Sequence, residues 1–339
     1  MFRNPGRNAP FFYIWHATPT QVRHKYTLHL LALLVMLGSS FGAEAQYFRD
    51  SNYWKTHRSE IAVGIGISNF LGELGGRDQI GSPFIWDLEF SQTKPAVSLG
   101  YRYYLAKTLS IRGAGTYGVL AGNDNLTKED FRENRNLSFR SNVIEAQVCL
   151  EWHPFQEMPG HMYDLRGVKG MAPSRTGLYF FLGVGGFHFN PKTQLDGAWV
   201  ELKPLGTEGQ GLPNGPDEYN LTQFCIPMGL GVRRALNKTM TIGLELQYTK
   251  TFTDYIDDVS GSYYDKTLLE EARGPVAAYL SDPSLGAIPG QTITGAQRGY
   301  SEHNDAYLFL KAQLHYKLFK YRTHNKKYRT RLRRQKIVF

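Results

Sequence analysis

Four aspartates crowd into one short stretch of the chain, 252–265 (FTDYIDDVSGSYYD), together with four aromatic residues. Carboxylate oxygens are the ligands that Ca²⁺ prefers, and the ion takes about six to eight oxygens. The spacing is not that of an EF-hand loop, and aspartate is also common where a strand turns into a loop. The stretch is therefore either a calcium site or a structural, water-facing rim, and its candidate ligands are Asp254, Asp257, Asp258 and Asp265.

A second set of ionisable residues could carry acid–base chemistry. Glu145, Glu245 and His315 combine two carboxylates with an imidazole, the groups that most often transfer protons in enzymes. Each of the three, however, sits on the polar side of a segment in which polar and apolar residues alternate. A structural role inside a folded sheet is the alternative, and it is the interpretation that we adopt.

Eight alternating segments of roughly ten residues or more run through the body of the chain. In the first, every second residue from Ile61 to Ile67 is branched and apolar, and the residues between them are small or polar. A strand with this period has one apolar and one polar face. Such segments, separated by polar loops, are typical of a transmembrane β-barrel. They cover 60–68, 96–105, 109–120, 144–153, 178–190, 224–233, 240–248 and 305–318.

The lengths of the connections favour a barrel over a soluble sandwich, which would also alternate. Only residues 106–108 and 236–238 separate the second from the third segment and the sixth from the seventh. The connections after the first, third, fifth and seventh segments are about 20, 17, 30 and 50 residues long. Outer-membrane barrels have short periplasmic turns and long outer loops. The exception, 154–174, is a long connection on the short side, and it is either a functional insertion or a disordered loop.

The polar faces predict what fills the barrel. An eight-stranded barrel has an interior just wide enough for side chains, and enclosed charges are costly unless they are paired. The inward positions carry four charges of each sign, which predicts a closed, polar, side-chain-filled lumen and no open pore. These residues are Glu60, Glu145, Glu151 and Glu245 against Arg102, Arg112, Arg233 and Lys311. Two inward cysteines, Cys149 and Cys225, are expected to lie too far apart to form a disulfide.

The two ends of the chain differ from its body. A short apolar run, 27–37, follows Arg23 and Lys25 and leads to Ala43-x-Ala45, which predicts a secretory signal peptide cleaved before Gln46; an uncleaved anchor is the alternative. The predicted organisation is an N-terminal extension with signal peptide at 1–45, a short periplasmic segment at 46–57, the barrel at 58–319 and a basic tail at 320–339. Most of the +9 net charge lies at the ends, because 317–339 carry +10 and 46–316 carry −4. An exported, mildly acidic body argues against nucleic-acid binding.

Several motifs resemble one family, the PorG-like outer-membrane barrels of Bacteroidetes, which are components of the type IX secretion system. They are EIAVGIGISNFLGELGG in the first segment, QFCIPMGLGVRRALNKTMTIGLELQYTKTFTDYIDDVSGSYYD through the sixth and seventh, and the closing DAYLFLKAQLHYKLF. The resemblance implies a non-enzymatic barrel without a cofactor or small-molecule substrate. It also implies an outer-membrane location with both termini in the periplasm, and partners in the periplasmic ring proteins PorK and PorN.

The basic tail is the predicted partner-binding segment. Its cations can dock on an acidic partner or on anionic lipid, and a solvated tail is the alternative. They begin in the sequence at Lys317, and the predicted contact residues are Lys320, Arg322, Lys326, Lys327, Arg329, Arg331, Arg333 and Arg334. Two other functions remain open at this point: a small outer-membrane enzyme acting on lipid or peptide, with His188 or His303 at its rim, and a surface adhesin or structural barrel.

Overall fold

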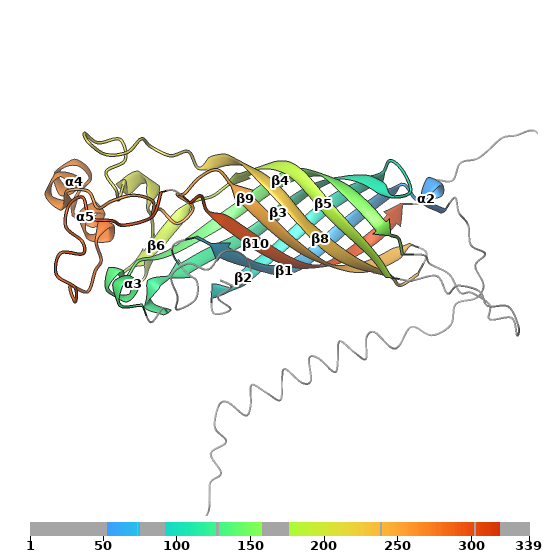
Figure 1. Ribbon diagram of the computed structural model, residues 1–339, viewed down its shortest axis with the longest axis horizontal. Helices are drawn as coiled ribbons and strands as arrows, with labels where there is room; N and C mark the ends of the chain where they lie inside the picture. Colours follow the sequence, from blue (N-terminus) through green and yellow to red (C-terminus); the bar gives the residue numbers. More distant parts are fainter. Residues whose placement is uncertain are drawn as a thin grey trace, which may run out of the picture. The chain divides into compact units, whose positions relative to one another are not determined.

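The computed structural model describes residues 53–72, 74, 92–126, 129–157, 176–237, 239–301 and 303–318. The predicted signal peptide and the tail from 319 onward lie outside them. Eight long strands run side by side along one axis (Figure 1), and each coincides with one of the predicted alternating segments. They are β1 (Ser59–Leu71), β2 (Lys94–Tyr104), β3 (Leu109–Asn123), β4 (Ser138–Phe155), β5 (Thr176–His188), β8 (Thr222–Ala235), β9 (Met240–Thr251) and β10 (Ala306–Leu318).

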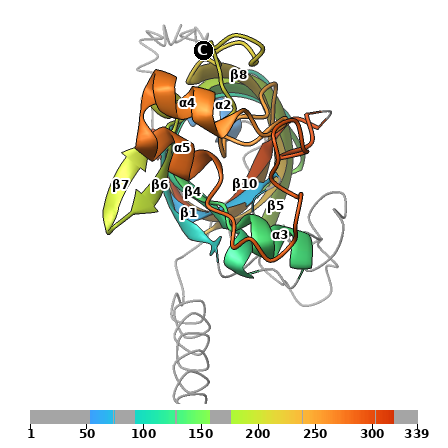
Figure 2. The same cartoon turned by 90° about the vertical axis from the view of Figure 1, so that its left-hand side faces the viewer.

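The eight strands close into a ring. Their order is β3-β2-β1-β10-β9-β8-β5-β4, and β3 pairs with β4 to complete the circle, with every pair antiparallel. Figure 2 shows this ring viewed from its end. Closure leaves no strand edge with unpaired N–H and C=O groups, which is the condition for a sheet to cross a membrane. The predicted eight-stranded antiparallel barrel is confirmed.

The barrel carries its apolar side chains on the outside. Along β4, exposed and buried residues alternate from Phe139 to His153, and the exposed ones include Ile144, Val148 and Leu150, each more than half exposed. Val184 of β5 and Ile65 of β1 are 68% exposed. A soluble protein rarely exposes so large a continuous apolar surface, whereas a bilayer solvates it. The surface is that of an outer-membrane-type barrel.

Short and long connections lie at opposite ends of the barrel, which are called here the turn end and the loop end. The two short turns join β2 to β3 and β8 to β9, and α2 (Tyr53–Thr56) lies at the same end. In the second turn, the Asn237 side chain accepts hydrogen bonds from the backbone N–H groups of Thr239 (2.9 Å) and Met240 (2.7 Å). Asparagine favours turns because it can bond to its own backbone in this way.

The loop end is covered by folded connections, which the alternation did not predict. The described parts of these connections, 124–137, 189–221 and 252–305, are referred to as the loop cap. A hairpin within it pairs with β4 and so continues the barrel wall, and its Asp196-Gly197 turn has positive φ at both residues (49° and 84°). The elements of the loop cap are η3 (Asp124–Leu126), α3 (Asp130–Arg135), β6 (Pro191–Leu195), β7 (Ala198–Glu201), η4 (Lys203–Leu205), α4 (Lys266–Arg273) and α5 (Pro275–Ser281). None of the described helices is both long and apolar enough to span a membrane.

The barrel interior has two zones, so the predicted polar filling describes only one of them. Charged and polar side chains occupy the half near the turn end. Towards the loop end, one apolar cluster runs from the barrel interior into the loop cap, with Phe70 packed edge-on against Phe139 (4.8 Å) and Phe187 against Tyr307 (5.7 Å). It continues through Ile256, Val259 and Leu280 of the loop cap. The barrel and the loop cap therefore share a core.

An arginine at the middle of the outer surface tests the membrane assignment. Leu182 is the central residue of β5 and is 58% exposed, whereas His188 ends the same strand at the loop end. We expect Leu182→Arg to lower the free energy of unfolding by about 2–4 kcal/mol, because the cation enters hydrocarbon, and His188→Arg to lower it by about 0–1 kcal/mol. Urea unfolding in phospholipid vesicles measures both. Equal effects at the two depths would contradict a transmembrane β5.

Candidate functional site

The half of the lumen near the turn end contains a continuous series of ion pairs. All eight charged residues predicted to point inward are at most 2% exposed. Seven of them alternate in sign along one chain of contacts, and two further residues extend it at the turn end. This charge ladder consists of Lys317, Glu157, Arg233, Glu60, Arg102, Glu151, Arg112, Glu245 and Lys311, in that order.

Each carboxylate of the charge ladder lies between two cations. Glu60 is 2.7 Å from Nη1 of Arg102 and 2.7 Å from Nη2 of Arg233. Glu151 contacts Arg102 through a bidentate pair, with 2.9 Å for the Nη2–Oε1 bond, and lies 3.0 Å from Nε of Arg112. Glu245 contacts Arg112 and lies 3.0 Å from Lys311. Because every charge has neighbours of opposite sign, no charge in the ladder is buried alone.

Aromatic rings complete the surroundings of three cations. The guanidinium of Arg102 lies 4.9 Å from the Tyr179 ring centroid, that of Arg112 lies 4.7 Å from Phe181, and Lys311 Nζ lies 5.7 Å from Phe309. Tyr179 also donates a hydrogen bond to Glu245 (2.5 Å). A ring face attracts a cation, and this attraction strengthens where water is excluded.

Glu145 is the one predicted lumen charge that the structure leaves out of the ladder. Its carboxylate accepts hydrogen bonds from Tyr307 (2.6 Å), Gln247 (2.7 Å) and Thr249 (3.3 Å). Among the described residues, no cation lies within ion-pair distance of it. Period-two alternation shows which side chains point inward, but it does not show which of them meet across the barrel.

The ladder includes two residues that the sequence did not assign to it. Lys317 was grouped with the basic tail, but it lies in β10, is 4% exposed and contacts Glu157 (3.1 Å). Its alternation with His315 was the signal that could have placed it inside. Glu157 follows β4 by two residues and turns into the turn end of the barrel, where it also contacts Arg233 (3.1 Å). It lies beyond the alternating segment, so no periodic signal predicted it.

The predicted acid–base residues do not form one site, because each is bound to other residues inside the lumen. His315 Nδ1 is 2.8 Å from Glu60, while Glu245 is held by Arg112 and Lys311. Ser110 and His153 form a further pair, which the alternation of residues does not reveal; their Oγ and Nε2 atoms lie 2.7 Å apart. Both side chains are at most 1% exposed, so a substrate has no access to them in this conformation.

The rim histidines also have structural contacts. His188 Nδ1 lies 3.0 Å from Thr222 Oγ1, and His303 stacks on Tyr300 (5.1 Å). The cysteines, Cys149 and Cys225, are both buried and free.

The aspartate stretch 252–265 is the interior of the loop cap and does not form an aromatic belt or a water-facing rim. Tyr263 is 3% exposed, and the Tyr255 ring stacks on Tyr219 (4.7 Å). The interpretation of this stretch as a water-facing rim is therefore wrong. The long loop folds back over the barrel, and burial of its rings in the shared core outweighs their preference for the membrane interface.

The four candidate calcium ligands have separate surroundings. Asp257 accepts hydrogen bonds from the backbone N–H groups of Leu74 (3.2 Å) and Val259 (3.1 Å). Asp265 caps α4 through the N–H groups of residues 267 and 268, and Asp254 is 6% exposed. No described group of three or more His, Cys, Asp or Glu side chains has the arrangement that a metal ion needs. The structure thus does not assemble the predicted aspartates into a calcium site.

Asp258 joins two distant parts of the loop cap. Its carboxylate accepts hydrogen bonds from Thr207 and Tyr219 (2.6 Å each), and its carbonyl oxygen accepts one from Arg298 (2.6 Å). Burial raises the pKa of Asp258 to about 6, although Arg298 and the two hydroxyl groups act in the opposite direction. Nearby Glu208 contacts Arg298 at 2.9 Å and adds to the rise of this pKa.

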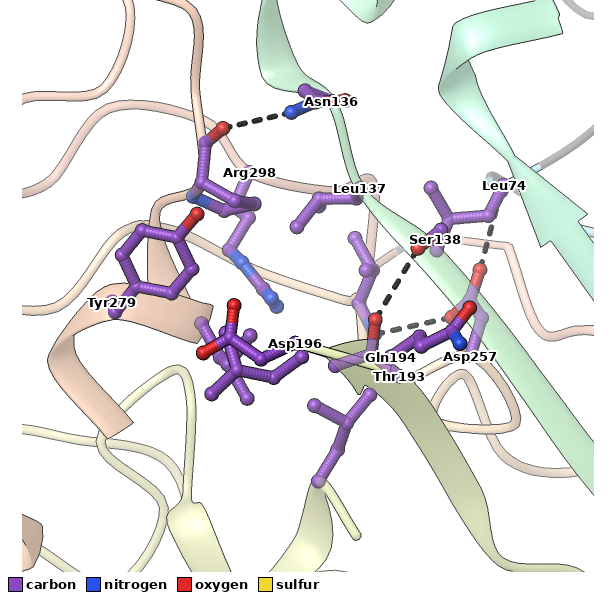
Figure 3. A pocket seen from close by; sticks show the side chains of 15 residues that line it. Leu74, Asn136, Leu137, Ser138, Thr193, Gln194, Asp196, Asp257, Tyr279 and Arg298 are labelled. Carbon is purple, nitrogen blue, oxygen red and sulfur yellow. Dashed lines mark hydrogen bonds between the residues drawn. The ribbon is translucent and has the colours of Figure 1, made fainter. Parts of the chain in front are cut away.

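The loop cap also contains a hollow of about 260 Å³ between the β6–β7 hairpin, the start of β4 and α5 (Figure 3). On one side, a hydrogen bond of 3.2 Å joins the hydroxyl groups of Ser138 and Thr193. Arg298 extends into the hollow from the opposite side.

No protein-family model and no curated protein matches this sequence. Among solved structures, the chain is similar to Ail, the attachment invasion locus protein of Yersinia pestis (9% identity, 77% of this chain and 99% of that chain, TM-score 0.35). It is also similar to Neisserial surface protein A (9%, 77% and 97%, 0.34) and to OprG from Pseudomonas aeruginosa (11%, 78% and 99%, 0.34). Likenesses at this level say nothing about function, and the transmembrane assignment rests on the barrel's own apolar surface.

Removing one carboxylate tests how much the paired charges of the ladder contribute to the free energy of unfolding. Glu60→Gln leaves Arg102 and Arg233 buried without this counter-ion, and we expect the free energy of unfolding to fall by about 3–5 kcal/mol. The matched control is Glu201→Gln in the exposed Lys192–Glu201 pair (2.7 Å), for which we expect about 0–1 kcal/mol. Urea unfolding in vesicles measures both. A loss at Glu60 no larger than at Glu201 would show that the ladder does not depend on paired charges.

The raised pKa of Asp258 predicts a pH dependence for the loop cap. The folded state binds this proton more readily than the unfolded state, so the associated stability is present in full below about pH 4 and is lost as the pH rises through about 6. A shift of about two pKa units corresponds to at most about 3 kcal/mol. Asp258→Asn should remove this dependence between about pH 4 and 6, and the partly exposed Asp265→Asn should retain it. Hydrogen exchange of peptide 252–265, corrected for intrinsic rates, measures the effect, and an unchanged pH slope in Asp258→Asn would refute it.

Proposed function

We propose that this protein is a non-enzymatic outer-membrane barrel of the type IX secretion and gliding machinery, bound to a periplasmic ring of PorK/PorN-like proteins. In this proposal the turn end and both termini face the periplasm, and the loop cap faces outward. The sequence motifs that resemble PorG-like barrels suggest the system. The structure contributes a physical reason why such a barrel can serve as an anchor.

The observation that carries the proposal is the contact between Glu157 and Lys317. Glu157 begins the long connection after β4, and Lys317 is the penultimate residue of β10, from which the basic tail continues. The 3.1 Å ion pair between them is buried at the turn end of the barrel. The long connection after β4 and the chain that continues into the basic tail therefore both start at the same opening. A ring that contacts one of them is within reach of the other.

The filled lumen supports an anchoring role. The charge ladder and the apolar cluster together occupy the interior from the turn end to the loop cap. A barrel packed in this way provides a stable transmembrane body. The basic tail supplies the complementary property, because ten cations without an acid in 317–339 attract an acidic partner.

A surface-binding function is the second candidate, and the packed loop cap favours it. Loops that fold into a common core with the barrel present a defined outer surface, which an adhesin needs. The two functions occupy opposite ends of the barrel, so one experiment at the turn end separates them.

Neutralising the tail tests the proposal. Replacing its eight predicted contact residues, Lys320, Arg322, Lys326, Lys327, Arg329, Arg331, Arg333 and Arg334, by glutamine keeps its length and removes all of its positive charges except that of Lys336. We expect affinity purification in mild detergent to recover ring proteins with the native chain and at least about tenfold less with this variant. Conversion of all eight residues to the opposite basic type, Lys to Arg and Arg to Lys, is the control and should preserve recovery. Ring proteins absent from the native sample, or equally abundant with the neutral tail, would reject the proposal.

A further inference from the structure

The hollow in the loop cap is a cavity that the anchoring function does not use, since it lies at the opposite end from the ring-binding segments. It is formed where the start of β4, the β6–β7 hairpin and the region from α5 to Arg298 meet, and Leu74, Asp257 and Val259 add to its lining. The polar side chains that matter for recognition are Asn136, Thr193, Gln194, Asp196, Tyr279 and Arg298. Its volume of about 260 Å³ is slightly below the roughly 300–1,000 Å³ of pockets for drug-sized ligands, so it suits one small ring.

Arg298 presents one free corner of its guanidinium to this hollow. The residue is only 2% exposed. Its Nε donates to the carbonyl of Ser281 (3.3 Å), and Nη1 donates to Glu208 (2.9 Å) and to the carbonyl of Asp258 (2.6 Å). Within the described part of the chain, Nη2 makes no hydrogen bond. Figure 3 shows the side chain pointing into the hollow, so this buried donor is available to a ligand.

The charge around the hollow favours a neutral ligand over an anion. Glu208 already balances the charge of Arg298 through the 2.9 Å ion pair. Two further carboxylates, Asp196 and Asp257, line the hollow and would repel a phosphate or sulfate. Asp196 is exposed at the hairpin turn and can accept hydrogen bonds, whereas Asp257 is occupied by backbone N–H groups. The available groups therefore match hydroxyl groups, which donate and accept at once.

Apolar groups occupy the remaining wall. Leu195, Leu202 and Leu280 line the hollow, and so does Tyr279, which is 55% exposed. A lining that combines polar groups with leucines and an aromatic ring fits a molecule with hydroxyl edges and a C–H face. A hexose ring has both surfaces.

We propose that the loop cap binds a neutral saccharide in this hollow, with Arg298 Nη2, Gln194 and Asp196 on its hydroxyl groups and Tyr279 against its C–H face. The site accommodates one sugar residue, either free or at the end of a glycan chain. Binding at this position would give the outer surface of the barrel a ligand specificity of its own, independent of the ring contact at the turn end.

The test uses the full-length protein in detergent and isothermal titration calorimetry with D-glucose, D-galactose and D-mannose as probes and sodium sulfate as the anion control. Arg298 holds the loop cap together, so the variants are Gln194→Ala and Tyr279→Ala, both at exposed positions. We expect at least one hexose to bind, and each variant to weaken its binding by at least about tenfold. Lys192→Ala, in the same hairpin but outside the hollow, is the matched control and should bind like the native chain.

Three results would overturn the proposal: no hexose binds at concentrations up to about 100 mM, both variants bind as tightly as the native chain, or sulfate binds and the hexoses do not. A trisaccharide that ends in the best hexose is the second arm of the experiment. Tighter binding than the free sugar would assign the site to the end of a glycan chain, and equal binding would assign it to free sugar. Both of these outcomes support a saccharide site.

Discussion

Inside a bilayer, an unpaired backbone N–H or C=O group finds no water, so the strands of this protein have to close on themselves. The pairing of β3 with β4 satisfies that requirement, and the other features follow from it. Eight strands enclose a space that side chains can fill. Because the outer faces of the strands are largely apolar, the charged residues at the inward positions are directed into that space, where water is scarce and each charge needs a partner.

Near the turn end, the charge ladder provides these partners. Its members come from β1, β2, β3, β4, β8, β9 and β10 and from the residues just after β4. Three of its ion pairs, Arg102–Glu151, Arg112–Glu245 and Arg233–Glu60, connect strands that are not neighbours in the ring. A slip of any strand by one residue would turn its charged side chains towards hydrocarbon and its apolar ones inward. The same contacts that neutralise the interior therefore also specify the register of the barrel.

Towards the loop end the protein uses a different solution. The loop cap covers the opening, and a continuous apolar cluster from Phe309 to Leu280 replaces the ion pairs. Buried polar groups such as Asp258, Glu208 and Arg298 then bond to one another or to the backbone of distant loops. Because the loops are packed on the barrel core, they form a surface of defined shape. The saccharide-sized hollow depends on this packing.

By itself, the sequence determined the number of strands, their faces and which charges point inward, because a period of two is a local property that neighbouring residues record. Only the tertiary structure decided which inward groups meet: Glu145 bonds to Tyr307 and not to a cation, and Lys317 and Glu157 join the ladder. It also decided that the aspartate stretch is interior, since the contact of Asp258 with Thr207 links residues 51 apart. The long connections have no periodic pattern from which their structure could be predicted. Contacts across a closed ring depend on distances that exist only after the chain has folded.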